Sequence, residues 1–141
     1  MPMYNEKIRA IALVIIKHNN LTLVSPGYDK VKDSHFYRLI GGGIEFGETA
    51  IEALNREVKE ELDSELINCE LLEISENIFC YNEFRGHEIC FVFKADFKDV
   101  AMYEQKEFQI LDSDIDNKAT WVEINEDTIS KIKPESAMKF F

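Results

Sequence analysis

The chain contains few of the residues that mark zinc proteins, thiol redox enzymes or disulfide-bonded secreted domains. It has only three cysteines, Cys69, Cys80 and Cys90, and no two of them have a CxxC spacing. An odd number of cysteines without that spacing is typical of buried thiols in a reducing compartment, so we expect a cytoplasmic protein. A disulfide is the alternative, because Cys80 and Cys90 would face each other across a hairpin centred near Arg85.

Basic residues and histidines are also scarce. The 141 residues include 16 Lys and Arg against 27 Asp and Glu, which gives a formal net charge of −11. Nucleic acid polymers and anionic membranes are bound by clustered Lys and Arg, so the composition argues against both as partners. It permits a phosphorylated small molecule, provided that metal ions neutralise the site. The three histidines, His18, His35 and His87, lack the spacing of a zinc or nucleophilic site.

Long apolar runs are missing as well. No stretch reaches the roughly 18 apolar residues of a membrane-spanning helix, and the first residues lack the apolar core of a secretory signal. The hydrophobic residues, 45% of the chain, instead occur in short segments that predict a single domain, 1–141, of mixed α and β structure. Their patterns predict strands at 9–17, 21–25, 36–40, 70–81, 88–97, 108–111 and 119–124, and helices at 48–62 and 127–133. We expect Pro26 and Gly27 to end the second strand, 28–34 and 82–87 to be loops, and Pro134 to end the last helix.

Half of the chain's six glycines are consecutive, from Gly41 to Gly43, and they precede the longest predicted helix. We expect them to form a loop between a strand and that helix. No Gly or Pro interrupts the segment 48–62, which is long enough for about four helical turns. At 100° per residue, its apolar side chains form one stripe that should face the core, namely Ile51, Leu54, Val58 and Leu62.

Three glutamates, Glu57, Glu60 and Glu61, fall on the neighbouring face of this helix. Carboxylates three or four residues apart repel, and each such pair costs a few tenths of a kcal/mol. Arg56 and Lys59 offset part of this repulsion, and a divalent cation would offset more. A ligand set made only of oxygen atoms suits Mg²⁺ or Mn²⁺ better than zinc. The simpler alternative is a solvated acidic face.

These residues resemble the Nudix box of the Nudix hydrolases, the MutT-like NUDIX domain proteins. The box runs from Gly42 to Ser64, and its matching positions are Gly42, Glu48, Arg56, Glu57, Val58, Glu60 and Glu61. The resemblance implies a Nudix-like α/β/α sandwich, in which a mixed β-sheet lies between helices and the box forms a loop and a helix. Asp63 and Ser64 stand where the family usually has glycine and an aliphatic residue. We expect this departure to affect the end of the helix and not metal binding, because Asp tolerates the left-handed conformation better than most residues.

The resemblance also implies a reaction, which is Mg²⁺- or Mn²⁺-dependent hydrolysis of a diphosphate linkage by water attack on phosphorus. The substrate would be a nucleoside diphosphate derivative or a nucleoside triphosphate, and a homodimer is common in the family. By the same resemblance, the metal would be held by Glu57, Glu60 and Glu61, with the backbone carbonyl of Gly41. Arg56 would hold Glu57 in place, and Glu48 would support either the loop or the residues around the metal ligands. The general base would be a box glutamate or a glutamate of a later loop, for which Glu104 and Glu107 are the candidates.

Two other functions are compatible with the sequence. The first is a non-catalytic nucleotide-sensing domain on the same fold, although a binder need not keep every box carboxylate. The second is a calcium-binding module, because Asp112, Asp114, Asp116 and Glu123 have the spacing of an EF-hand loop. An EF-hand requires a helix beginning in 120–124, where this sequence predicts a strand.

Overall fold

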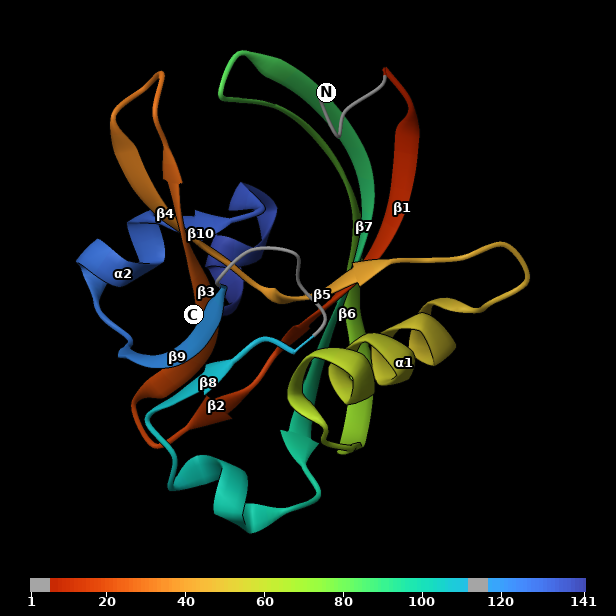
Figure 1. Cartoon of the computed structure of the whole chain (residues 1–141), viewed down its shortest axis with the longest axis vertical. Helices are drawn as coiled ribbons and strands as arrows, with labels where there is room; N and C mark the ends of the chain where they lie inside the picture. The colour runs from red at the N-terminus through yellow and green to blue at the C-terminus, as the bar shows by residue number, and fades with distance from the viewer. Residues whose placement is uncertain (1–5, 112–116) are drawn as a thin grey trace.

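A computed structural model describes residues 6–111 and 117–141, and its strands form two β-sheets (Figure 1). The first is a four-stranded sheet with the order β5-β1-β7-β6. The second has six strands, with the order β10-β4-β3-β9-β8 and with β2 paired to β3. The predicted mixed α and β class is therefore confirmed, with the strands divided between two sheets.

The described residues form ten strands and four helical segments. The strands are β1 (Ile8–Ile15), β2 (Lys17–His18), β3 (Leu21–Asp29), β4 (Ser34–Arg38), β5 (Ile40–Gly43), β6 (Leu66–Tyr81), β7 (Phe84–Phe97), β8 (Glu107–Gln109), β9 (Lys118–Glu123) and β10 (Ile132–Lys133). The helices are α1 (Ala50–Leu62) and α2 (Glu126–Ser130), and the 3-10 segments are η1 (Val100–Tyr103) and η2 (Glu135–Phe140). None of these helices is long and apolar enough to cross a membrane.

The β6–β7 hairpin closes with a shorter turn than the sequence predicts. Only Asn82 and Glu83 lie between its strands, both with positive φ, as tight hairpin turns require. The strands consequently extend to Tyr81 and from Phe84, which changes the residues that face each other. Cys80 is opposite Arg85 and Cys90 is opposite Ser75. All three cysteines are free, so the disulfide alternative was wrong.

The second strand also continues further than expected. β3 passes through Pro26 and Gly27 and ends at Asp29, so the predicted end at the Pro-Gly pair was wrong. Its pairing with β9 stops at Val24, so beyond that point β3 pairs only with β4. Proline is tolerated in a strand at such a place because one side needs no backbone donor. The predicted loop 28–34 shrinks to 30–33.

The last predicted helix, 127–133, is shorter in the structure. α2 ends at Ser130, and Ile132 and Lys133 pair in parallel with β4 as β10. Ile132 is fully buried there and belongs to the second cluster of core residues. Pro134 follows β10 and precedes η2.

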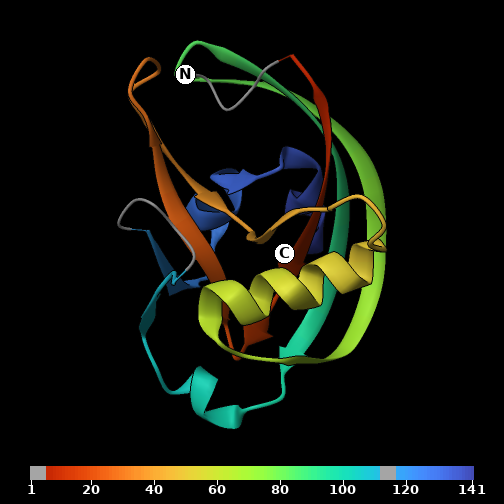
Figure 2. The same ribbon diagram turned by 45° about the vertical axis from the view of Figure 1, so that its right-hand side comes forward.

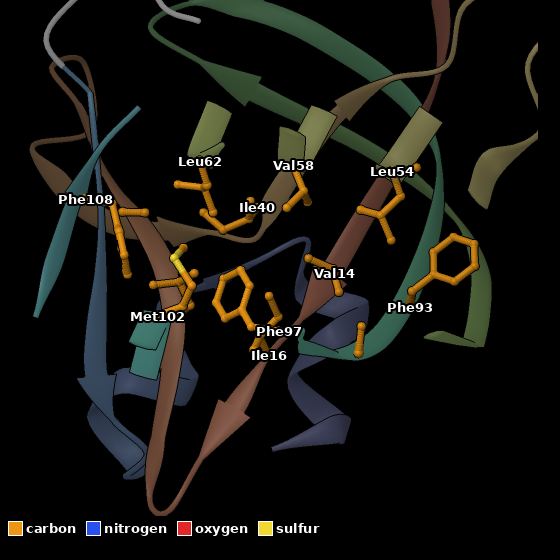
Figure 3. Packing of buried hydrophobic residues seen from close by; sticks show 14 of the residues in the cluster. Val14, Ile16, Ile40, Leu54, Val58, Leu62, Phe93, Phe97, Met102 and Phe108 are labelled. Atoms are coloured by element: carbon orange, nitrogen blue, oxygen red, sulfur yellow. The ribbon is translucent and has the colours of Figure 1, made fainter. Parts of the chain in front are cut away.

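Helix α1 contributes one side of the main hydrophobic core (Figure 3). Leu54, Val58 and Leu62 point from it toward residues of both sheets and of η1, among them Val14, Ile40, Phe93, Phe97, Met102 and Phe108. Each such buried side chain stabilises the fold by about 1.5–3 kcal/mol. The predicted stripe is thus confirmed for these three positions, while Ile51 is only partly buried. Figure 2 shows α1 lying across the strands as the one long helix of the described residues.

Candidate functional site

The three consecutive glycines lie in β5 and do not form a loop. Their strand pairs with β1, with Gly43 opposite Ile11 and Gly41 opposite Leu13. Gly41 has φ +143°, and a Cβ atom there would lie 2.0 Å from the carbonyl oxygen of Ala12. The expectation of a glycine loop was therefore wrong, and Gly41 is needed for the close approach of β5 to β1.

Gly42 has a different role, which concerns the helix. A Cβ atom at this position would lie 2.5 Å from Cδ of Glu57. The Glu57 carboxylate therefore rests directly against the β5 backbone, with no side chain between them. Strand β5 and helix α1 therefore meet at Glu57, the carboxylate that the Nudix resemblance implies as a metal ligand.

The start of α1 is held by two groups of hydrogen bonds. Thr49 caps the helix and accepts from the Glu52 backbone N–H at 3.3 Å, while Glu52 accepts from the Thr49 N–H at 2.9 Å. This capping box was readable in the sequence as Thr-x-x-Glu, but our sequence analysis did not use it. Glu48 accepts from the Glu45 N–H at 2.9 Å and so closes the turn that precedes the cap.

Arg56 is the centre of the acidic cluster. Its Nε and Nη2 donate to the two carboxylate oxygens of Glu48, at 2.8 and 2.9 Å, and Nη2 also donates to the Gly43 carbonyl at 2.9 Å. Its Nη1 donates to Glu57 at 3.1 Å and to Glu60 at 3.2 Å. One guanidinium thus connects β5, the turn and two successive turns of α1.

The protonation states in this cluster follow from these contacts. Hydrogen bonds from Arg56 and from the Glu45 backbone lower the pKa of Glu48 to about 2. The same pairing, first with Glu48 and then with Glu57, raises the pKa of Arg56. Both groups are therefore charged throughout the physiological range, and their bidentate geometry orients the neighbouring carboxylates.

A divalent metal site is not preformed as a cage. Among residues 6–111 and 117–141, no three His, Cys, Asp or Glu side chains converge to hold an ion. Glu57 and Glu60 point instead to the same nitrogen of Arg56. The donor set itself fits Mg²⁺ or Mn²⁺, because it consists of carboxylate oxygens beside glycine backbone.

A cleft of about 750 Å³ lies between the two sheets and reaches the box. Gly41, Gly42 and Glu61 line one part of it, and the aromatic side chains of Phe36 and Tyr81 line another. These two rings meet edge to face, with centroids 5.7 Å apart. Glu61 therefore lies where the box meets the cleft, and its backbone carbonyl accepts from the Leu111 N–H at 2.9 Å.

Sequence reasoning missed the cations of this cleft. Arg9, Lys32, Arg38 and Lys133 all line it, although the chain as a whole is strongly acidic. No motif connects these residues, because Arg9, Arg38 and Lys133 come from strands far apart in the sequence and Lys32 comes from the turn between β3 and β4. Only the register of the sheets brings them together.

The two candidates for a loop base lie elsewhere. Glu104 follows η1, and Glu107 begins β8, where its carboxylate is 3.4 Å from Nζ of Lys118. Both side chains are exposed, and neither lines the cleft in the described part of the chain. The structure does not bring them to the Arg56 cluster.

The described residues do not contain the helix that the EF-hand alternative requires after Asp116, because Lys118–Glu123 is a strand. Residues 112–116, which include three of its acidic positions, lie outside the described residues. Lys118–Glu123 forms strand β9, so the helix that an EF-hand needs after its loop is replaced by a strand.

Two sheets, a glycine strand and an acidic helix oriented by one arginine define the class that the box predicted, a Nudix-type hydrolase domain. The model of the NUDIX domain family matches residues 6–136, and the chain belongs to this family. No curated protein sequence matches it.

Solved structures of the family share the fold at low sequence identity. A NUDIX hydrolase from Nitrosomonas europaea is 18% identical with a TM-score of 0.66, covering 94% of this chain and 85% of its own. A MutT NUDIX hydrolase from Burkholderia pseudomallei is 20% identical with a TM-score of 0.63, and the match covers 95% of this chain and 98% of that protein. A mutator MutT protein from Bacillus halodurans is 18% identical with a TM-score of 0.61, and the match covers 94% of this chain and 78% of that protein. These likenesses confirm the fold.

Proposed function

We propose that this protein is a Mg²⁺- or Mn²⁺-dependent pyrophosphohydrolase. Its substrate is a nucleoside diphosphate derivative or a nucleoside triphosphate, cleaved at a diphosphate linkage by water attack on phosphorus. The observation that carries the proposal is the Arg56 cluster, in which the box side chains contact each other beside an open cleft.

The charge of the cluster favours a divalent cation. Four carboxylates, from Glu45, Glu48, Glu57 and Glu60, lie within 3.8 Å of the Arg56 guanidinium. One guanidinium cannot neutralise four carboxylates, so negative charge remains where a cation and then a diphosphate would bind. A hard cation with oxygen ligands offsets this excess.

In this proposal Glu61 is both a metal ligand and the general base, and every other side chain has one task. Glu57, Glu60 and Glu61 hold the ion together with the Gly41 carbonyl, and Arg56 orients Glu57 and Glu60 through its Nη1. Glu48 fixes the other edge of the guanidinium. When bound, the metal supplies a polarised phosphoryl group and a bound water of lowered pKa. Glu61 is the best-placed general base, because it is the box glutamate that lines the cleft.

The test is a substrate panel with and without Mg²⁺ or Mn²⁺. The panel contains nucleoside triphosphates, dinucleotides, nucleotide sugars and ADP-ribose, and the readout is the release of phosphate or pyrophosphate products. We expect turnover that requires the metal and is lost in Glu57→Gln and Glu60→Gln. Glu70→Gln is the matched control, because its exposed carboxylate pairs with Lys94 away from the cluster.

Inactivity across the panel would contradict the proposal. Wild-type protein that is as inactive as Glu60→Gln across the whole panel is not a hydrolase of this class. Tight nucleotide binding under those conditions would identify the sensing domain instead. The variants Glu104→Gln and Glu107→Gln should keep activity if the base belongs to the box.

A further inference from the structure

A row of polar side chains crosses the second sheet and faces the cleft. Ser25 of β3 is in register with Arg38 of β4, which is in register with Lys133 of β10. Residues paired across neighbouring strands point to the same face of a sheet. All three line the cleft, so this face is the cleft wall.

A second row lies on the facing sheet. Arg9 of β1, Glu88 of β7 and Asn77 of β6 are in register, and all three line the same cleft. Nη1 of Arg9 is 3.6 Å from a carboxylate oxygen of Glu88. Arg38 of the opposite wall also acts electrostatically on Glu88, so the two rows approach each other here. One carboxylate, that of Glu88, is thus shared between two guanidiniums.

Positive charge therefore exceeds negative charge at this part of the cleft. Lys133 donates to Glu135 at 2.9 Å, but the Arg38 side chain makes no hydrogen bond to any residue that the structure describes. A guanidinium directed at a cleft takes anionic oxygen groups such as phosphate or carboxylate, to which it can donate two parallel hydrogen bonds.

Ser25 supplies an independent observation. The residue is only 5% exposed, and its buried Oγ has no hydrogen-bond partner among the described residues. Native proteins leave few buried hydroxyl groups without a partner, and such sites are often completed by a ligand or an ordered water. Its cross-strand neighbour is Arg38, whose side chain is exposed and lines the same cleft.

We propose that Arg38, with Ser25 and Arg9, forms an anion subsite that takes a phosphate ester or carboxylate of the substrate remote from the hydrolysed diphosphate. Its role in substrate recognition rests on the proposed function, whereas the binding of an anion does not. The subsite distinguishes substrates that carry such a second anionic group from those that end in a neutral base or sugar.

The first experiment is a titration with inorganic phosphate in the presence of EDTA, followed by calorimetry, so that no metal recruits phosphate to the box. We expect Arg38→Gln to weaken binding about ten-fold, because a charge-assisted bidentate contact is lost. Ser25→Ala should weaken it about three-fold without lowering the melting temperature, because it removes a hydroxyl that has no partner. Lys98→Gln is the control, since Lys98 pairs with Glu65 outside the cleft, and it should bind phosphate as the wild type does.

The titration can overturn the subsite. If Arg38→Gln and wild-type protein bind phosphate equally, Arg38 does not hold an anion. If Arg56→Gln weakens binding as much as Arg38→Gln, the phosphate is at the box, whose cation is Arg56, and no separate subsite exists.

The second experiment identifies the source of the anion. Two substrate pairs, NADPH with NADH and UDP-glucuronate with UDP-glucose, share a diphosphate and differ by one phosphate ester or one carboxylate. We expect the wild type to prefer the anionic member of one pair in kcat/KM by about ten-fold, and Arg38→Gln to remove that preference. Equal turnover of both members of each pair refutes the role in recognition. Absence of turnover of all four compounds also refutes the role in recognition, while the broad panel decides the hydrolase proposal and the phosphate titration decides the subsite.

Discussion

Gly41 and Gly42 are adjacent in β5, yet replacing each of them by alanine should damage the protein in different ways. At Gly41 the new Cβ would lie 2.0 Å from a backbone oxygen of β1, and φ is +143°. Neither strand can move without breaking the sheet. We expect Gly41→Ala to lose about 2–4 kcal/mol of unfolding free energy, from backbone strain and overpacking together.

At Gly42 the new Cβ would meet the far end of a flexible side chain, the carboxylate of Glu57, at 2.5 Å. Glu57 can turn away, at the cost of its 3.1 Å hydrogen bond with Arg56. We expect Gly42→Ala to lose only about 1 kcal/mol of stability, since one hydrogen bond is broken. Metal affinity should fall about 10- to 100-fold, because a ligand is moved out of place.

Two measurements on the same preparations separate these effects. Urea denaturation gives the unfolding free energy, and calorimetric titration with Mn²⁺ gives the affinity for the metal. Gly43→Ala serves as a comparison, because the nearest atom to its Cβ is a terminal nitrogen of Arg9, 3.4 Å away. Equal loss of metal affinity and of stability in Gly41→Ala and Gly42→Ala would refute the reasoning, since it would mean that Glu57 has no special relation to Gly42.

Three further predictions concern α1 and its ends. Glu48→Gln should reduce stability at pH 7 and make stability less dependent on pH in the acid range. The fold lowers the pKa of Glu48 from 4.5 to about 2, so its contribution to stability is present above pH 4.5 and is lost as the pH falls toward 2. Urea titrations across that pH range would show or exclude this difference. Asp63→Gly should raise the unfolding free energy by up to about 1 kcal/mol, because Asp63 has φ 49° at the helix end, and a change in Mn²⁺ affinity would contradict a role limited to the cap. Leu54→Ala should cost about 2–5 kcal/mol by leaving a cavity in the main core, and a loss below 1 kcal/mol by urea denaturation would show that the core closes around it.

Local patterns were sufficient for the elements whose signals lie within one segment. The α1 stripe, the long hairpin, the strand at β9 and the box spacing are all periodic or contiguous, so the physics of a single helix or strand determines them. Asp63 belongs to the same group, because a left-handed Asp at a helix end depends on a few neighbouring residues. The ends of β3 and α2 did not follow from such signals, because their partners are strands distant in the sequence.

The sequence by itself therefore determined the class of this protein and the side chains of its acidic cluster, which one loop and one helix carry together. Only the tertiary structure decided that the three glycines form a strand and that Glu57 rests on Gly42. It also decided that Ser25, Arg38 and Arg9 meet in one cleft, because the register between strands brings together residues that no spacing along the chain connects.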